Sequence, residues 1–385
     1  MFFANSKISA QKAGIFVCEY VLYSSHMFQK IFQKFIQSRK GGKAGPGIGI
    51  DLGTTNTLVY VEDRGVVIDE PSVVALNQKT NQVVAVGNQA KIMLGKTPGH
   101  ISAIRPLVDG VISDFEVTEE MLAYILRKTM EVLKISSIPR VVIGVPFGVT
   151  NVERRAVRDA AASAGAKEIY IIEEPMAAAV GVGLPIKEAR GSMIVDIGGG
   201  TTDIAVISLG GIVRGKNLKV AGDRFNTDII SYIRNEFKLL IGEKTAEQIK
   251  IDLSNVMPGN PPAEAAVRGR DLVTGLPKEI FVTEEDIHDA IHLSADSLFE
   301  AVKEVLESTP PEILADIMTN GIYLSGGGAL IKNLDAAFTE YLGIKVKVAH
   351  DPLTAVARGA GMIAGDMDTY RDLIIENEDE LPIRR

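Results

Sequence analysis

A unit of strand, aspartate and glycine-rich turn occurs twice in this chain, and this repeat constrains the fold more than any other sequence feature. The first unit occupies residues 48–61 around Asp51, and the second occupies residues 193–207 around Asp196. In each unit an apolar run leads to the aspartate, a turn of glycine and hydroxyl residues follows, and a second apolar run closes a pattern typical of a β-hairpin. The two units lie 145 residues apart, so the sequence predicts a duplicated α/β domain.

The two turns have the chemistry of phosphate-binding loops. Glycine lets the backbone approach an anion closely with its N–H groups directed inward, while threonine and asparagine side chains add donors. An aspartate beside a phosphate requires a cation between the two, and Mg²⁺ keeps most of its water ligands in such sites. We therefore expect the turns to face each other across nucleotide phosphates, with Asp51 and Asp196 holding Mg²⁺ largely through water. Either turn alone is compatible with an ordinary hairpin, but the duplication argues against that interpretation.

A third glycine cluster, at residues 325–328, follows an apolar strand at residues 322–324 and precedes a predicted helix at residues 329–334. A glycine turn between a strand and a helix N-terminus is typical of an anion or nucleoside pocket. Alone the cluster is weak evidence, because many loops contain three glycines.

Two adjacent acids, Glu173 and Glu174, follow a predicted strand at residues 168–172 and precede a predicted helix at residues 176–180. A carboxylate at the carboxyl end of a strand, where α/β proteins bind ligands, can orient a water for attack on a γ-phosphate. Acidic residues also stabilise a helix N-terminus through the helix dipole, and we assign only that role to Glu173. Upstream, a predicted helix at residues 153–164 has Asn151 as its candidate cap.

Composition limits the class of protein. The 385 residues are 46% apolar and 23% charged, which suits a globular protein of two or three domains and argues against disorder. Cys18 is the single cysteine, so the sequence excludes an intramolecular disulfide and indicates a reducing compartment. We do not expect an integral membrane protein, because no uninterrupted apolar run approaches the roughly 18 residues of a membrane span.

Charge is unevenly distributed along the chain. Residues 1–47 carry seven lysines and arginines and one acid, whereas the whole chain has a net charge of −8, so the remainder has a balance of −14. The acidic body disfavours nucleic-acid binding, because phosphates need cationic neutralisation. A basic arm on an acidic body favours contact with an anionic membrane surface.

The basic arm contains one helical stripe of apolar residues. Their spacing is i, i+3, i+4, i+7 and i+8, and they are Phe28, Ile31, Phe32, Phe35 and Ile36. Within residues 27–47, this pattern predicts an amphipathic helix in the membrane interface, followed by a glycine-rich tether. Such a helix can also dock on the protein's own core. Residues 1–26 resemble a weak signal peptide without a cleavage site, and an alternative hypothesis is that translation begins at Met27.

In this order, the motifs resemble those of the actin-fold ATPase superfamily, and within it the MreB family of bacterial actin homologues. The resemblance runs from about Ile48 to about Ala364. Its main stretches are GIDLGTTNTLVYV (49–61), IRPLVDGVISDF (104–115), IEEPMAAAVGVGLP (172–185), SMIVDIGGGTTDIAVISLGGIV (192–213), AGDRF (221–225) and LSGGGALIKNLD (324–335).

The resemblance implies an α/β, actin-like (duplicated ribonuclease H-like) fold in which two lobes enclose ATP and Mg²⁺. The first lobe is expected at residues 48–180, with a small subdomain inserted at about 75–113. The second is expected at residues 181–357, with a small subdomain inserted at about 221–290. Residues 358–385 are expected to return to the first lobe and to end in an acidic tail.

The resemblance also implies site roles. Glu174 would position the attacking water with help from Thr201, which would also contact the phosphates, and Asp51 and Asp196 would serve Mg²⁺. Further nucleotide contacts would come from Gly53, Thr54, Thr55, Asn56, Gly198, Gly199, Gly200, Gly222, Glu247, Gln248, Ile249, Lys250, Gly326, Gly327, Gly328, Ala329 and Leu330. From the residues alone, Glu247 and Lys250 are an i, i+3 pair of the kind that is usually solvated.

The sequence departs from the family pattern at two positions, since Thr55 and Asp203 stand where alanine and glutamate are common. Some members bind membranes through an apolar loop instead of a helix. Ile135 and Ile138 occupy that region here, and we expect them in the core.

The implied function is that of a cytoplasmic cytoskeletal protein that binds ATP, hydrolyses it weakly and polymerises head to tail into paired filaments on the inner face of the cytoplasmic membrane. Its partners would be further copies of itself, the membrane surface and the cell-wall synthesis machinery, and it would direct cell shape through peptidoglycan synthesis. Two alternatives remain open. A heat-shock-chaperone-like ATPase would need a β-rich peptide-binding domain, and a sugar-kinase-like enzyme would need a carboxylate base in a polar substrate pocket.

Overall fold

The computed structural model describes residues 47–375 except residues 139 and 260, and these residues belong to one compact unit. The predicted membrane helix and tether, the N-terminal extension and the acidic tail therefore lie outside the described residues. Among the helices that the structure describes, none is both long enough and apolar enough to cross a bilayer.

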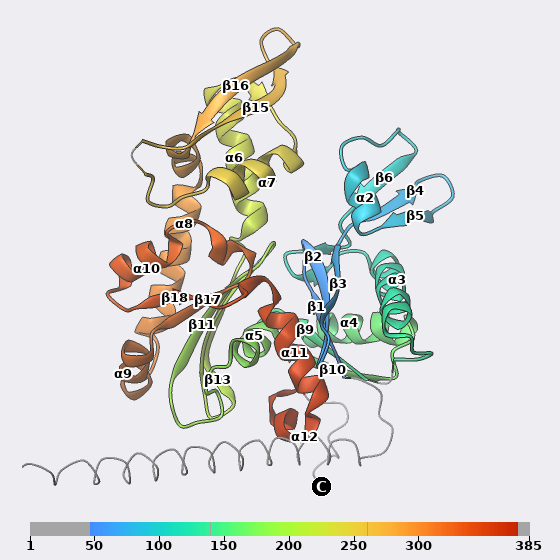
Figure 1. Cartoon of the computed structure of the whole chain (residues 1–385), viewed down its shortest axis with the longest axis vertical. Coiled ribbons are helices and arrows are strands. Elements are labelled where there is room, and N and C mark those ends of the chain that lie inside the picture. Colours follow the sequence, from blue (N-terminus) through green and yellow to red (C-terminus); the bar gives the residue numbers. More distant parts are fainter. Residues whose placement is uncertain (1–46, 139, 260, 376–385) are drawn as a thin grey trace, which may run out of the picture. The chain divides into compact units, whose positions relative to one another are not determined.

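Two five-stranded sheets with the same internal order form the framework of the unit (Figure 1). The first sheet has the order β10-β9-β1-β2-β3 and the second has the order β13-β12-β11-β17-β18. Each contains one antiparallel hairpin, β1·β2 or β11·β12, whose first strand also pairs in parallel with a later strand. This correspondence confirms the predicted duplication and the α/β actin-like class.

The strand bounds place the predicted hairpins where the sequence repeat indicates. The first sheet comprises β1 (Ile48–Leu52), β2 (Asn56–Val61), β3 (Gly65–Pro71), β9 (Arg140–Val145) and β10 (Glu168–Glu173). The second comprises β11 (Ser192–Ile197), β12 (Thr202–Ser208), β13 (Gly211–Leu218), β17 (Ile322–Ser325) and β18 (Val346–Val348).

Buried strands with two apolar faces divide the core into layers. In β9, Val141 and Ile143 face a cluster that includes helices α3 (Phe115–Leu133) and α4 (Asn151–Ser163), whereas Val142 faces the opposite side. In β11, Val195 packs with the helices of the second half and Ile194 packs on the same side as Val142. Because alternate residues of a strand point to opposite faces, each sheet is covered on both sides.

The shared inner layer consists of two helices, α5 (Glu174–Val182) and α11 (Ala355–Gly365). They pack closely because their contact surface is made of small residues. A methyl group on Gly359 would overlap the Ala177 carbonyl oxygen, and one on Gly181 would overlap the Ala355 carbonyl oxygen. The small residues after Glu174 therefore bring two helices together between the sheets.

Each half also carries a small α/β insertion. The first contains β4 (Val74–Asn77), β5 (Gln82–Val86), α2 (Asn88–Met93) and β6 (Ile101–Ile104), followed by the short pair β7 (Leu107–Val108) and β8 (Val111–Ile112). The second contains α6 (Gly222–Glu236), β14 (Leu239–Leu240), α7 (Glu243–Leu253), β15 (Glu264–Asp271) and β16 (Pro277–Thr283). The remaining elements are α8 (Glu284–Glu307), α9 (Pro311–Asn320), η1 (Gly327–Leu330), α10 (Leu334–Leu342), η2 (Pro352–Thr354), α12 (Met367–Tyr370) and η3 (Arg371–Leu373).

Two local predictions were wrong. The cap of α4 is Thr150 and not Asn151, because Thr150 and Glu153 form a reciprocal capping box in which Thr150 N donates to Glu153 Oε2 at 2.7 Å. The helix predicted at residues 329–334 is a 3₁₀ turn over Gly327–Leu330, and α10 starts only at Leu334. In contrast, Ile138 is 2% exposed and Ile135 packs against the core, as expected.

Candidate functional site

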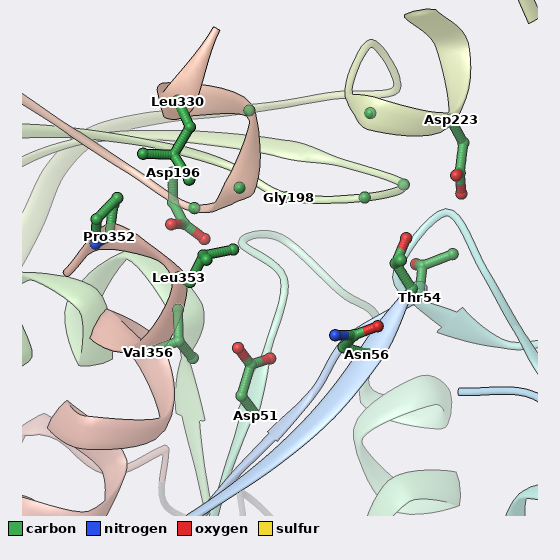
Figure 2. Close-up of a pocket in the computed structure, with 18 of the residues that line it drawn as sticks. Asp51, Thr54, Asn56, Asp196, Gly198, Asp223, Leu330, Pro352, Leu353 and Val356 are labelled. Carbon is green, nitrogen blue, oxygen red and sulfur yellow. The ribbon is translucent and has the colours of Figure 1, made fainter. Parts of the chain in front are cut away.

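A cavity of about 690 Å³ lies where the carboxyl ends of β1 and β11 approach each other (Figure 2). Ligand pockets typically have this size and occur at the carboxyl ends of α/β strands. Most of the predicted site residues line it: Asp51, Gly53, Thr54, Thr55, Asn56, Glu174, Asp196, Gly198, Gly199, Gly200, Thr201, Gly222, Glu247, Lys250, Gly326, Gly327, Gly328 and Leu330. Gln248, Ile249 and Ala329 are not among the lining residues.

The two glycine-rich turns pack directly against each other across this cavity. A methyl group on Gly200 would lie 2.6 Å from Thr54 Oγ1, and one on Gly199 would overlap Thr55 Oγ1. The backbone of Gly110 donates to Thr54 Oγ1 at 2.9 Å, whereas Thr55 Oγ1 is buried without a hydrogen-bond partner among the described residues. The turns thus form a narrow cradle that contains one hydroxyl group without a hydrogen-bond partner within the residues that the structure describes.

A pair of aspartates lies beneath the cradle. Burial, and then the neighbouring charge of Asp196, raise the pKa of Asp51 to about 8. Burial raises the pKa of Asp196 to about 6, although a hydrogen bond with Ser325 opposes the shift. The Oδ1 atom of Asp196 is buried and unpartnered within the described part of the chain. An unpaired carboxylate oxygen beside a second carboxylate is a donor set that suits a hydrated divalent cation.

Glu174 occupies the first turn of α5 and is 8% exposed. Burial, followed by the charges of Asp203, Asp51 and Asp196, holds its pKa well above the ordinary range of a glutamate. A cation among these acids would favour the ionised form, which can accept a proton from water. The position therefore fits a water-orienting carboxylate.

Asp203 lies close to this acidic group but outside the cavity lining. Its Oδ1 atom accepts hydrogen bonds from Phe147 N at 2.8 Å and from Asn217 Nδ2 at 3.0 Å. Burial nevertheless raises its pKa to about 7. Asp203 therefore joins the second hairpin to the segment that follows β9 of the first sheet.

The geometry of α7 explains why only part of the predicted segment 247–250 reaches the cavity. Glu247 and Lys250 share one helix face, and Lys250 Nζ donates to the Gly222 carbonyl oxygen at 2.9 Å. Burial lowers the pKa of Lys250. Gln248 points away and binds Asp252, while Ile249 is 5% exposed and packs in the core.

The third glycine turn packs against the end of β11. Gly326 has φ 79°, which favours glycine, and a methyl group on Gly328 would overlap the Ile197 side chain. Beyond this turn, Leu330 and Leu353 present exposed apolar side chains to the cavity, whereas Ala329 is 1% exposed and lies in the core behind it. An apolar pair of this kind can hold a flat ring.

Sequence reasoning missed several lining residues. These are Leu58, Val66, Asp69, Lys91, Gly110, Asp223, Phe225, Asn226, Ile251, Ser254, Ile331, Asp351, Pro352, Leu353, Thr354 and Val356. The segment after β18 could have been found, because β18 pairs in parallel with β17 and therefore ends at the same edge. No strand order of this kind could have identified Lys91, because it reaches the cavity from the small insertion of the first half.

A family model described as MreB/Mbl protein matches residues 45–372. Curated relatives include a cell shape-determining protein Mbl of Bacillus cereus, 48% identical over 88% of this chain and 98% of its own length. They also include the cell shape-determining protein MreB of Escherichia coli K12, 50% identical over 84% of this chain and 94% of its own length.

Solved structures that are similar to this chain include members of the same family. A crystal structure of Spiroplasma citri MreB5 bound to ADP is 41% identical, with a TM-score of 0.79 over 84% of this chain and 98% of its own. The AMPPNP-bound form of that protein has a TM-score of 0.80 at 40% identity, over 86% of this chain and 99% of its own. A MamK double helical filament has a TM-score of 0.69 at 26% identity, over 82% of this chain and 98% of its own.

Proposed function

Because this chain belongs to the MreB/Mbl protein family, we propose that it binds ATP with Mg²⁺, hydrolyses it slowly and polymerises into membrane-associated filaments. These filaments would lie on the inner face of the cytoplasmic membrane and guide peptidoglycan synthesis, and so direct cell shape. The proposal rests on the cradle of two aspartate-led turns, with its unpartnered Asp196 Oδ1 and Thr55 Oγ1 atoms. The nucleotide-bound MreB5 structures support it.

Each part of the cavity has a proposed role. Asp51 and Asp196 would hold Mg²⁺, which neutralises phosphate charge when it is bound. Backbone N–H groups of residues 199 and 200 and the Thr55 hydroxyl would bind phosphate oxygens, whereas the Gly198 N–H donates to the Thr201 carbonyl oxygen at 2.9 Å within the turn. The Leu330 and Leu353 side chains would hold the base, and Glu247 and Lys250 would lie beside the ribose.

Glu174 would orient the attacking water, with Thr201 beside it. Both residues line the cavity, and they are contributed by different halves of the chain. Their relative position therefore depends on how closely the halves approach. We propose that hydrolysis is slow for this reason, and that it accelerates when assembly fixes the closed arrangement.

Self-association and membrane binding belong together in this proposal. The MamK double helical filament supports assembly of this fold into filaments, and we propose that the subunits join head to tail. One short amphipathic helix at residues 28–36 would bind a membrane weakly, but a filament presents many helices at once and gains avidity. The membrane surface and the cell-wall synthesis machinery are the proposed partners.

Calorimetry with ATP and GTP, each with Mg²⁺, tests the nucleotide site directly. We expect one nucleotide per chain, and heat of binding absent for both nucleotides would overturn the proposal. Sedimentation with ATP then tests assembly. Deletion of residues 27–40 should abolish co-pelleting with anionic liposomes while filaments still form, and unchanged co-pelleting would remove the membrane role from this helix.

A further inference from the structure

The small insertions of the two halves contact each other across the mouth of the cavity. Arg105, directly after β6, pairs through Nη1 with Asp223 Oδ2 at 3.0 Å and through Nη2 with Glu243 Oε1. On α2 of the same insertion, Lys91 Nζ lies 3.4 Å from Glu247 Oε1 on α7. Both cations come from the first half and all three carboxylates come from the second. We name these five residues the ionic clasp.

The clasp is connected to the phosphate end of the cavity by hydrogen bonds of the backbone. The Asp223 N–H donates to the Gly199 carbonyl oxygen at 2.8 Å, and the Gly222 N–H donates to the Gly198 carbonyl oxygen at 3.1 Å. Asp223, one of the two acids that pair with Arg105, is therefore hydrogen-bonded directly to the second glycine-rich turn. Separation of the insertions would pull on the start of α6 and on this turn together.

We propose that the ionic clasp retains bound nucleotide, with Arg105 as a positioning residue that ties the first insertion to the second phosphate-binding turn. The inference rests on the proposed nucleotide function and adds to it the step that limits release. A nucleotide held between the two turns leaves only when the insertions separate, and separation breaks both pairs of Arg105 and the pair of Lys91.

The geometry favours a functional clasp over an incidental surface pair. The Arg105 side chain is 21% exposed, and the planar guanidinium engages two carboxylates at once, which lowers the entropy lost per contact. A partly exposed pair typically contributes a factor of about two to five in an equilibrium. Arg105 makes two of the three pairs, so its removal predicts a release rate about 4- to 25-fold faster.

A matched control is available within the first half. Arg140 pairs through Nε with Glu168 Oε2 at 3.1 Å, and its side chain is 27% exposed. This pair joins two strands of one sheet and does not cross the cavity. Arg105→Ala and Arg140→Ala thus remove arginine–carboxylate pairs of similar exposure, and only the first opens the clasp.

The experiment measures release of a fluorescent ATP analogue, bound with Mg²⁺, after a chase with excess unlabelled ATP. We expect release about 4- to 25-fold faster from Arg105→Ala and unchanged release from Arg140→Ala. Higher salt should accelerate release from the wild type more than from Arg105→Ala, because salt screens the clasp. Equal release from all three proteins would overturn the clasp, whereas failure of the wild type to bind the analogue would overturn the proposed function instead.

A second readout does not require nucleotide. In a Cys18→Ser background, spin labels at Val84 and Val273, which are 46% and 81% exposed in the two insertions, report their separation by electron–electron dipolar spectroscopy. Arg105→Ala should give a longer or broader distance distribution than Arg140→Ala. Identical distributions in the two variants would contradict the clasp even if release rates differed.

Discussion

The two glycine-rich turns, which we propose bind phosphate, share a sequence pattern but differ in what they present to the cavity. In the first turn, Thr54 and Asn56 carry side chains that are already bonded, Thr54 to Gly110 and Asn56 to Asp69 at 3.1 Å. The second turn begins with three glycines, and the carbonyl oxygens of its residues 198 and 199 accept hydrogen bonds from α6. The first turn is thus anchored by side chains, and the second is anchored through its backbone.

The close approach of the turns explains this difference. Methyl groups on Gly199 and Gly200 would meet Thr55 and Thr54, so there is room for side chains on one side only. If the second turn also had hydroxyl side chains at positions 199 and 200, these side chains would hold the two turns apart. The duplicated pattern therefore gives complementary halves: the first supplies hydroxyl groups and Glu174, and the second supplies backbone N–H groups.

The largest expected effect is on the rate of ATP hydrolysis, and it distinguishes Glu174 of the first half from Asp203 of the second. Glu174→Gln should slow ATP hydrolysis by about 10²- to 10⁴-fold and leave ATP affinity within about twofold, because the substitution removes only the group that orients water. Asp203→Asn should slow hydrolysis much less, since Asp203 binds Phe147 and Asn217 and lies outside the cavity lining. Single-turnover phosphate release measures the hydrolysis rate of both variants. Equal decreases in rate would contradict the assignment of the water-orienting role to Glu174 alone.

The second effect tests the steric argument. Gly199→Ala should force the turns apart and weaken Mg²⁺-ATP binding by about 10- to 100-fold, as expected when a methyl group is inserted into a packed contact. Gly211→Ala is the control, because its added methyl group would lie 3.9 Å from the nearest atom, the Ser208 carbonyl oxygen. Calorimetry compares the affinities, and wild-type affinity in Gly199→Ala would show that the turns do not need this contact.

The third effect uses the different pKa values of the two aspartates, about 8 for Asp51 and about 6 for Asp196. Without a cation, the folded protein binds more protons than the unfolded chain above the ordinary aspartate pKa of 3.8, so its stability falls as the pH rises towards 8. A bound cation needs the ionised forms, and its binding releases these protons.

Mg²⁺-ATP affinity should therefore rise between about pH 6 and pH 8, by up to about tenfold per pH unit. Asp51→Asn should abolish most of this rise, because it removes the group with the higher pKa. Titrations in buffers of different ionisation enthalpy measure the released protons. An affinity in the wild type that is constant over this range would contradict the assignment of Mg²⁺ to these carboxylates.

The sequence predicted the hairpins and the duplication because local signals encode them. Asp51 and Asp196 each end an apolar run and precede a glycine-rich turn. This local pattern strongly favours a β-hairpin. The contact between the turns was not predictable, since it depends on how the halves pack. The same holds for Lys91, which lies far from the motifs in sequence, and for Arg105, which lies in the stretch 104–115 but carries no site signal there. Both reach the cavity mouth only through tertiary structure.

Local capping also limited the sequence prediction. Asn151 is an acceptable cap by residue type, but the adjacent Thr150 has its partner Glu153 at the spacing that a capping box requires. Ile249 shows a different limit. The family pattern marks the whole segment 247–250, whereas helical periodicity turns Ile249 into the core and leaves Glu247 and Lys250 on the cavity face.

The smallest effect separates the two hydroxyl groups of the first turn. Thr55→Val keeps the side-chain shape and removes a hydroxyl without a partner in the described structure, so Mg²⁺-ATP affinity should fall about 3- to 10-fold while the free energy of unfolding stays constant. Thr54→Val leaves the Gly110 N–H without its acceptor and should lower the free energy of unfolding by about 1 kcal/mol. Calorimetry and denaturant titration of both variants measure the two quantities. If Thr55→Val lost stability and kept its affinity, the first turn would act through its fold alone, and its hydroxyl groups would have no role in phosphate binding.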